Sequence, residues 1–219
     1  MQNTLLNIVC KTVLVDPFSM STPIVIDGKG HVAGRLSAAI AKMLLNGKRI
    51  VVVRSEDIVT NGDHRFNYHK YRRFLHKTTN TNPRDGPFHQ RAPSEMFLRT
   101  VRGMCNYKTA RGAAAFANLK VFEGVPPKYE SSTKRVIPHA LRVVSIHHER
   151  PTTSLGTLAT TFGWKYGGIV HKLEEQRINR NNELHKEHQT GHKAYLQALA
   201  AANKQLGAQA VKFLDSYVE

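Results

Sequence analysis

The stretch IVIDGKGHVAGRLSAAIAKML, residues 24–44, decides the fold. An apolar run, Ile24–Ile26, leads into a turn with three glycines, and the turn leads into a segment whose apolar residues recur at helical spacing. Residues 48–53 end in a continuous apolar run, which is typical of a strand buried on both faces. This order predicts a β-α-β unit with strands at 24–27 and 48–53, a helix at 34–46 and a right-handed crossover between parallel strands.

The same turn raises the alternative of a nucleotide site, because strand, glycine-rich turn and helix is an order that cradles phosphates. The dinucleotide fingerprint is Gly-x-Gly-x-x-Gly, whereas Gly28, Gly30 and Gly34 are spaced one residue too widely. Arg54 stands where an acidic residue would bind a ribose, and Arg35 stands where a P-loop needs lysine. A nucleotide-dependent α/β enzyme therefore remains only as the alternative function. The amides of the turn, together with Arg35, favour an anion such as a nucleic-acid phosphate.

Further elements follow from the hydrophobic pattern and its breaks. We expect helices at 66–76, 94–101 and 109–119, an irregular loop at 79–93, a strand at 119–122 and a weaker strand at 141–146. From residue 171 the composition favours a long helix. Its apolar stripe comprises Tyr195, Leu199, Ala202, Leu206, Phe213 and Tyr217. The predicted organisation is an N-terminal extension (1–23), an α/β RNA-binding core domain (24–170) and a helical C-terminal extension (171–219).

Charge gives the strongest indication of function. The 219 residues include 32 Lys and Arg against 16 Asp and Glu, a formal net charge of +16. Such an excess repels itself unless a polyanion neutralises it, and nucleic acid is the most frequent such partner. With only two cysteines, Cys10 and Cys105, the sequence argues against a disulfide framework or a cysteine-rich zinc site and suits a reducing compartment. No apolar run approaches membrane-spanning length, and residues 1–23 lack the features of a secretory or mitochondrial leader.

Half of the charge excess lies within residues 61–112. This segment holds eleven basic and three acidic residues. Seven aromatic residues are interleaved with them: Phe66, Tyr68, Tyr71, Phe74, Phe88, Phe97 and Tyr107. Because basic side chains meet phosphates and rings stack on unpaired bases, the pattern predicts a surface for single-stranded or irregular RNA. Phe66, Phe74 and Phe97 are nevertheless expected in the core, since isolated aromatic residues are usually buried.

The sequence gives little indication of a metal site or of a catalytic site. His188 and His192, with His185 nearby, could share a zinc ion on a helix, but Gly191 is expected to interrupt that helix and no cysteine supports the site. Neither a G-x-S-x-G elbow nor an H-E-x-x-H motif occurs. We therefore expect no metal, no cofactor and no catalysis.

Four longer stretches occur in order between about residue 24 and about residue 177. They are VIDGKGHVAGRLSAAIAKMLLNGKRIVVV, then NPRDGPFHQRAPSEMFLRTVRGM with the following KTARGAAA, then LKVFEGVPPKYE, and last GWKY followed by LEEQR. Together they resemble the universal large-subunit ribosomal protein family number thirteen, in its archaeal and eukaryotic form. The resemblance implies a three-layer α/β/α fold with a small, mostly parallel four-stranded sheet. It also implies a non-catalytic structural constituent of the large ribosomal subunit that binds ribosomal RNA and helps fold it.

The resemblance and the charge pattern together predict the contact residues. The phosphate contacts are expected to be Arg35, Arg65, Lys70, Arg72, Arg73, Lys77, Arg84, Arg91, Arg99, Arg102, Lys108 and Arg111. His89 and Tyr107 are candidates for base or sugar contacts. Neighbouring ribosomal proteins are expected partners, through the C-terminal helix, whereas a membrane or a homo-oligomer is not. The expected location is the cytoplasmic ribosome, with nucleolar assembly if the source is eukaryotic. An extra-ribosomal RNA-binding regulator remains a third reading.

Overall fold

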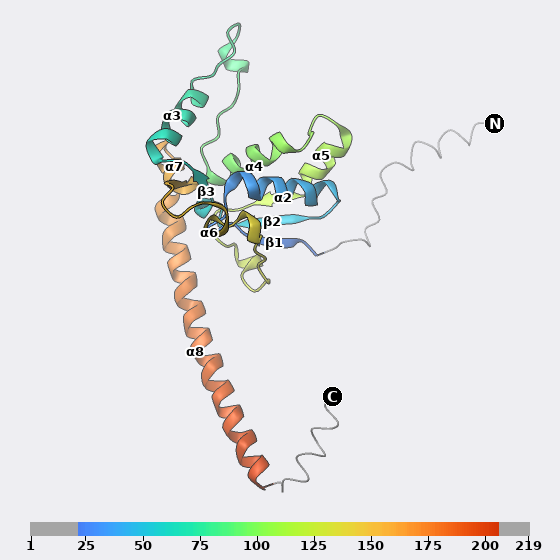
Figure 1. The fold of residues 1–219 in the computed structure, drawn as a ribbon, viewed down its shortest axis with the longest axis vertical. Coiled ribbons are helices and arrows are strands. Elements are labelled where there is room, and N and C mark those ends of the chain that lie inside the picture. Colours follow the sequence, from blue (N-terminus) through green and yellow to red (C-terminus); the bar gives the residue numbers. More distant parts are fainter. Residues whose placement is uncertain (1–21, 206–219) are drawn as a thin grey trace, which may run out of the picture. The chain divides into compact units, whose positions relative to one another are not determined.

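The computed structural model describes residues 22–205 (Figure 1), so the predicted extension almost entirely, and Leu206, Phe213 and Tyr217 of the tail stripe, lie outside the described residues. The chain divides into two compact units, one ending at Val170 and one beginning at His171. The strands are β1 (Ile24–Asp27), β2 (Ile50–Val53), β3 (Val59–Asn61), β4 (Leu119–Val121) and β5 (Thr152–Ser154). The α-helices are α2 (Ala33–Leu45), α3 (His64–Leu75), α4 (Pro93–Met104), α5 (Ala110–Ala117), α6 (Arg142–Ser145), α7 (Leu155–Thr161) and α8 (Gly167–Gln205). Short 3-10 turns are η1 (Ser55–Asp57), η2 (Pro83–Asp85), η3 (Pro127–Tyr129) and η4 (Pro138–Ala140).

The main sheet is parallel, with strand order β1-β2-β4. Ile24 lies opposite Ile50, and Ile50 lies opposite Leu119. β3 and β5 pair with each other in a separate antiparallel ribbon. The predicted α/β class and the parallel β-α-β unit are confirmed. Within the described residues the main sheet has three strands rather than the four expected.

Helix α2 follows the predicted pattern closely. Leu36, Ile40 and Leu44 are fully buried and share one face, because residues four apart lie above one another on a helix. The helix ends at Leu45 with Asn46 as its C-cap, and Gly47 takes a positive φ of 78° while its N–H donates to the Leu44 carbonyl at 2.9 Å. The expected helix at 34–46 is thus displaced by a single residue.

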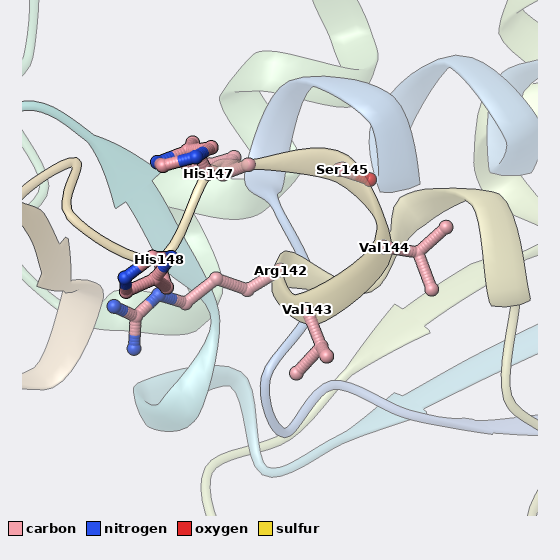
Figure 2. A pocket seen from close by; sticks show the side chains of 7 residues that line it. Arg142, Val143, Val144, Ser145, His147 and His148 are labelled. Carbon is pink, nitrogen blue, oxygen red and sulfur yellow. The ribbon is translucent and has the colours of Figure 1, made fainter.

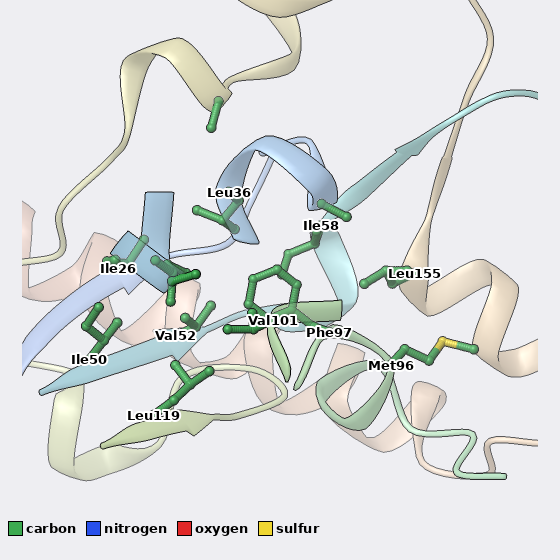
Figure 3. Packing of buried hydrophobic residues seen from close by; sticks show 14 of the residues in the cluster. Ile26, Leu36, Ile50, Val52, Ile58, Met96, Phe97, Val101, Leu119 and Leu155 are labelled. Carbon is green, nitrogen blue, oxygen red and sulfur yellow. The ribbon is translucent and has the colours of Figure 1, made fainter. Parts of the chain in front are cut away.

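The two faces of the sheet are covered differently. Ile26, Ile50 and Val52 face a core shared with α2, α4 and α5, in which Phe97 and Val101 are fully buried (Figure 3). The side chains that alternate with them, those of Val25, Val51 and Val53, pack against Tyr129 of η3 and its adjoining loop. Both crossovers move in the same direction across the sheet. Right-handed connections therefore bring α2, α4 and α5 to one face.

The strand expected at 141–146 is wrong, because residues 142–145 form helix α6. Its run of apolar, β-branched residues resembles a strand, yet Val143 is 91% exposed and Val144 is 68% exposed. Tertiary hydrogen bonds decide the outcome. The Val32 N–H donates to the Ala140 carbonyl at 2.8 Å, and the Arg142 N–H donates to the Gly30 carbonyl at 2.8 Å. The segment is therefore fastened to the glycine turn rather than to a strand edge.

The remaining predicted helices are confirmed as α3, α4 and α5, and the strand at 119–122 as β4. In the second unit α8 continues through Gly191, so the expected interruption there is wrong. A single exposed glycine costs a helix only about 1 kcal/mol, which so long a helix tolerates. None of the described helices is both long and apolar enough to span a bilayer.

Candidate nucleic-acid interface

The glycine turn after β1 serves packing. The Gly28 N–H donates to the Val53 carbonyl at 2.8 Å, and a Cβ on Gly28 would lie 2.9 Å from the carbonyl oxygens of both Val53 and Arg54. Gly30 has a φ of 70°, which favours glycine, and its N–H donates to the Asp57 carbonyl at 3.2 Å. At Gly34 neither a positive φ nor a close neighbour requires glycine. Two of the three glycines therefore have a local structural reason.

The carboxyl end of β1 is closed by an ion pair. The Arg54 Nε donates to Asp27 Oδ1 at 2.9 Å, and a second guanidinium nitrogen donates to Oδ2. Asp27 Oδ1 also accepts the Lys29 N–H at 3.0 Å. On its other edge β1 forms a parallel bridge to Arg135, in which the Asp27 N–H donates to the Arg135 carbonyl at 3.0 Å and the Arg135 N–H donates to the Val25 carbonyl at 2.8 Å. These observations disfavour the nucleotide alternative.

Other amides of the turn before α2 are engaged as well, and the anion contact expected at the start of α2 stays a prediction. The His31 N–H donates to the Gly28 carbonyl at 3.2 Å, and the Val32 N–H is held by Ala140. The N–H groups of residues 28–32 thus donate to acceptors within the protein. Arg35, on the first turn of α2, is exposed and remains a candidate for a phosphate contact.

His31 locks the turn to the segment before α6. The imidazole is fully buried; Nε2 accepts the Ile137 N–H at 3.1 Å, and Nδ1 lies 3.1 Å from the Lys29 carbonyl. This pair of contacts assigns the proton to Nδ1, because Nε2 must accept and a carbonyl can only accept. Burial lowers the pKa of His31, against smaller opposing effects from the Lys29 and Gly28 backbone and from Asp27. The neutral ring is the form that fits.

Residues 64–92, comprising α3, the following loop and η2, form what we call the basic arm. Figure 1 shows α3 and the loop extending away from the main sheet. The arm carries seven basic residues and one acidic residue, Asp85. All seven basic side chains are exposed, and none pairs with a carboxylate within residues 22–205. They are Arg65, Lys70, Arg72, Arg73, Lys77, Arg84 and Arg91.

The base of the arm is fixed by Asn67, whose side chain is buried. Its Nδ2 donates to the Gly62 carbonyl at 3.0 Å and approaches Thr153 Oγ1 at 3.2 Å. The Thr153 hydroxyl in turn donates to the Gly62 carbonyl at 2.9 Å. The start of α3 is therefore tied to the β3-β5 ribbon, far away in sequence.

Several aromatic residues of the arm are used inside the protein rather than left for bases. Tyr68 stacks on Phe162 with ring centroids 5.0 Å apart, and Tyr71 lies 4.8 Å from the same ring. The Tyr71 hydroxyl donates to the Gln90 carbonyl at 2.5 Å. Burial raises the pKa of Tyr71, partly offset by Arg99 and Arg91. These contacts fix α3 to Phe162, the residue after α7, and fix the end of the loop at Gln90 to α3.

Arg99 of α4 lies over the Phe74 ring, 3.5 Å from its centroid, and His89 meets the same ring edge-on at 4.4 Å. The His89 Nε2 donates to the Lys77 carbonyl at 2.9 Å. His89 therefore clamps the loop to the end of α3. Its predicted base or sugar contact stays a prediction.

The other predicted residues continue from the arm along α4 and α5. Arg102 lies over the Tyr107 ring at 5.0 Å, and Tyr107 is 43% exposed. Lys108 is exposed before α5, and the Arg111 guanidinium donates to the Leu45 carbonyl at 3.4 Å. Arg99, Arg102, Lys108 and Arg111 are exposed and pair with no carboxylate among the described residues.

The expected core roles of the phenylalanines divide three ways. Phe97 is fully buried, and Phe74 is half-buried beneath Arg99. Phe66 is 63% exposed, so its core assignment is wrong; α3 turns this position toward solvent, and the ring lies near Gly62. Phe88, which the predicted contact set omits, is 85% exposed. Its position between Pro87 and His89, in a loop without apolar periodicity, was the available signal.

A shallow hollow of about 570 Å³ lies at residues 142–148 around α6 (Figure 2). Its lining contains a serine and two histidines, a set that invites comparison with a catalytic site. However, the Ser145 hydroxyl donates to the His139 carbonyl at 2.7 Å, and His147 and His148 each lie 3.8 Å from Glu149. No nucleophile is aligned with a base in this part of the described chain. The hollow does not favour an enzyme.

Comparison with known protein families matches residues 21–128 to the family described as Ribosomal protein L13. The matched region spans about half of the chain, from just before β1 into η3, and so contains the main sheet, the glycine turn and the whole basic segment. Its members are structural proteins of the large ribosomal subunit, and the exposed, unpaired cations suit a ribonucleoprotein. The chain belongs to this ribosomal protein family.

Proposed function

We propose that the protein binds large-subunit ribosomal RNA through the basic arm and the adjoining residues of α4 and α5, and that it helps this RNA to fold during subunit assembly. One observation carries the proposal. The eleven basic side chains of residues 61–112 are exposed and pair with no carboxylate among the described residues. A ribosomal protein with such a surface has phosphates as its natural counter-charge.

The arrangement suits RNA folding as well as RNA binding. Asn67, Phe162 and His89 hold the arm in place, so its charges are presented from a fixed support. A fixed array of cations lets phosphates of separate RNA segments approach one another, because it offsets their mutual repulsion. The protein acts without catalysis in this proposal.

The partners beyond the arm are inferred from α8 by itself. Leu173, Leu184 and Tyr195 are each more than half exposed on this helix. Apolar side chains in such numbers favour a covering partner. We assign that role to neighbouring ribosomal proteins or RNA in the cytoplasmic ribosome, after nucleolar assembly if the source is eukaryotic.

A binding experiment tests the proposal. Purified protein is titrated with deproteinised large-subunit ribosomal RNA, and the double variant Arg72→Gln, Arg73→Gln is compared with the matched control Lys120→Gln, Lys128→Gln. The control removes the same charge from exposed lysines outside the arm. We expect weaker binding of the arm variant only, and co-migration of the wild type with large subunits in sucrose gradients. Equal affinities for all three proteins, or no RNA binding at all, would overturn the proposal.

A further inference from the structure

Phe88 is out of place for a protein that acts through charge alone. Its ring is 85% exposed, although its neighbours in the chain are held firmly. Gly86 before it is buried, and a Cβ there would lie 3.0 Å from the Pro83 carbonyl oxygen. On the other side, His89 is clamped to Lys77 and Phe74. With both flanks facing inward and Pro87 restricting the backbone, the loop holds the Phe88 ring in solvent.

The loop around Phe88 is also ordered by its own polar groups. Asn82 Oδ1 accepts the Arg84 N–H at 3.2 Å at the start of η2, and Asn82 Nδ2 donates to Asp85 Oδ2 at 2.6 Å. The only carboxylate of the arm is thus partly neutralised by an amide dipole. Lys77, Arg84 and Arg91 remain exposed in the same loop. The immediate surroundings of the ring are therefore cationic.

We infer that Phe88 stacks on an unpaired base of the RNA that the basic arm binds. The inference rests on the proposed function and adds the kind of RNA to it. A flat apolar face beside free cations matches a nucleobase beside its phosphates, because the ring covers the base while Arg84 and Arg91 meet the backbone. A regular duplex offers no such face, since its bases are already stacked. The site therefore selects a loop, bulge or single strand.

Three substitutions of Phe88 separate stacking from other roles. Phe88→Ala removes the ring and is expected to weaken binding to deproteinised large-subunit ribosomal RNA by about fivefold to about a hundredfold. The slope of affinity against salt stays unchanged, because no phosphate contact is lost. Phe88→Leu keeps an apolar side chain without a π-face and is expected to restore little. Phe88→Trp is expected to bind as the wild type does.

The tryptophan variant also gives a direct signal. The chain has a single tryptophan, Trp164, which is half-buried, so the added fluorescence of Phe88→Trp reports on the loop. Addition of the RNA is expected to quench this added fluorescence, whereas a fully paired RNA duplex leaves it unchanged. Val143→Ala serves as the control, since it trims a 91% exposed apolar side chain outside the arm. It is expected to leave RNA affinity intact.

The outcomes distinguish failure of this inference from failure of the proposed function. If the wild type does not bind the RNA, the proposed function fails. If the wild type binds and Phe88→Ala binds equally well, only the stacking role fails. Full rescue by Phe88→Leu, or a flatter salt slope in Phe88→Ala, also overturns stacking. The stacking role is also overturned if the Phe88→Ala protein keeps its RNA affinity but no longer binds another ribosomal protein. Unchanged thermal unfolding of Phe88→Ala is expected, because the ring is exposed.

Discussion

Substitution of Gly28 by alanine tests the reading of the turn after β1 as a packing device. A Cβ at this position would lie 2.9 Å from the Val53 carbonyl oxygen, the Arg54 carbonyl oxygen and Ile58 Cγ1, well inside ordinary contact distances. Two of these atoms are backbone oxygens, one of the fully buried Val53 and one of Arg54, whose carbonyl already accepts the Asp57 N–H at 3.2 Å. The strands must therefore separate, or the turn must shift away from β2.

The size of the effect follows from three contributions. Forcing an extra carbon into a packed site costs about 1–3 kcal/mol, and weakening the hydrogen bond from the Gly28 N–H to Val53 adds about 0.5–1.5 kcal/mol. Alanine also restricts the unfolded chain, which raises the unfolding free energy by about 0.4–1 kcal/mol. The net loss of unfolding free energy is about 2 kcal/mol. For a folded unit of this size, that loss lowers the melting temperature by about 4–8 °C.

Gly34→Ala is the matched control. Gly34 lies in the first turn of α2 with no atom near the position of a Cβ and no positive φ. This variant is therefore expected to gain about 0.5–1 kcal/mol, because alanine is the better helix former. Thermal and urea unfolding of both variants give the comparison. A Gly28→Ala protein as stable as the wild type, or a destabilised Gly34→Ala protein, would refute the reasoning about the turn.

Three further predictions concern the contacts that position the arm and the turn. Because burial lowers the pKa of His31, the stability that the neutral ring contributes is complete above the ordinary histidine pKa of about 6.5 and declines as the pH falls below it. Unfolding free energies measured from about pH 7 to about pH 5 should therefore fall more steeply for the wild type than for His31→Gln. Parallel curves for the two proteins would contradict this. Asn67→Ala should cost about 1–3 kcal/mol and open the start of α3 to trypsin, and an unchanged cleavage pattern would remove Asn67 from this role. Asp27→Ala and Arg54→Ala, measured singly and together, should show a coupling energy of about 1–3 kcal/mol; additive effects would mean that the ion pair does not close the turn.

The local pattern predicts the β1-α2-β2 unit well because its decisive interactions are close in sequence. Leu36, Ile40 and Leu44 define one helix face without any knowledge of the sheet. The strands β3 and β5 are missed, since each has three residues and their partners lie about ninety positions apart, as Thr60 and Thr153 do. Segment 141–146 is mistaken for a strand because its apolar run meets solvent, a placement that depends on distant hydrogen bonds to the glycine turn.

The candidate interface likewise has features that the sequence alone predicts and features that depend on distant contacts. Net charge identifies residues 61–112, because the excess of cations is a property of the sequence alone. Which aromatic rings are free to contact RNA cannot be read from the sequence alone, since Tyr68 and Tyr71 pack against Phe162, which is far along the chain. Phe88 stands out only once the loop is seen to hold it in solvent. Charge thus predicts the kind of partner, and the fold decides which rings are available to it.

The salt dependence of ribosomal RNA binding tests the central claim most directly. Each phosphate neutralised contributes a slope of about −0.7 to −0.9 to the plot of log affinity against log salt. Arg72→Gln with Arg73→Gln should therefore flatten the wild-type slope by about 1.4–1.8, while Lys120→Gln with Lys128→Gln leaves it unchanged. A wild-type affinity that does not respond to salt, or an arm variant with the wild-type slope, would contradict the assignment of the basic arm as the RNA-binding surface.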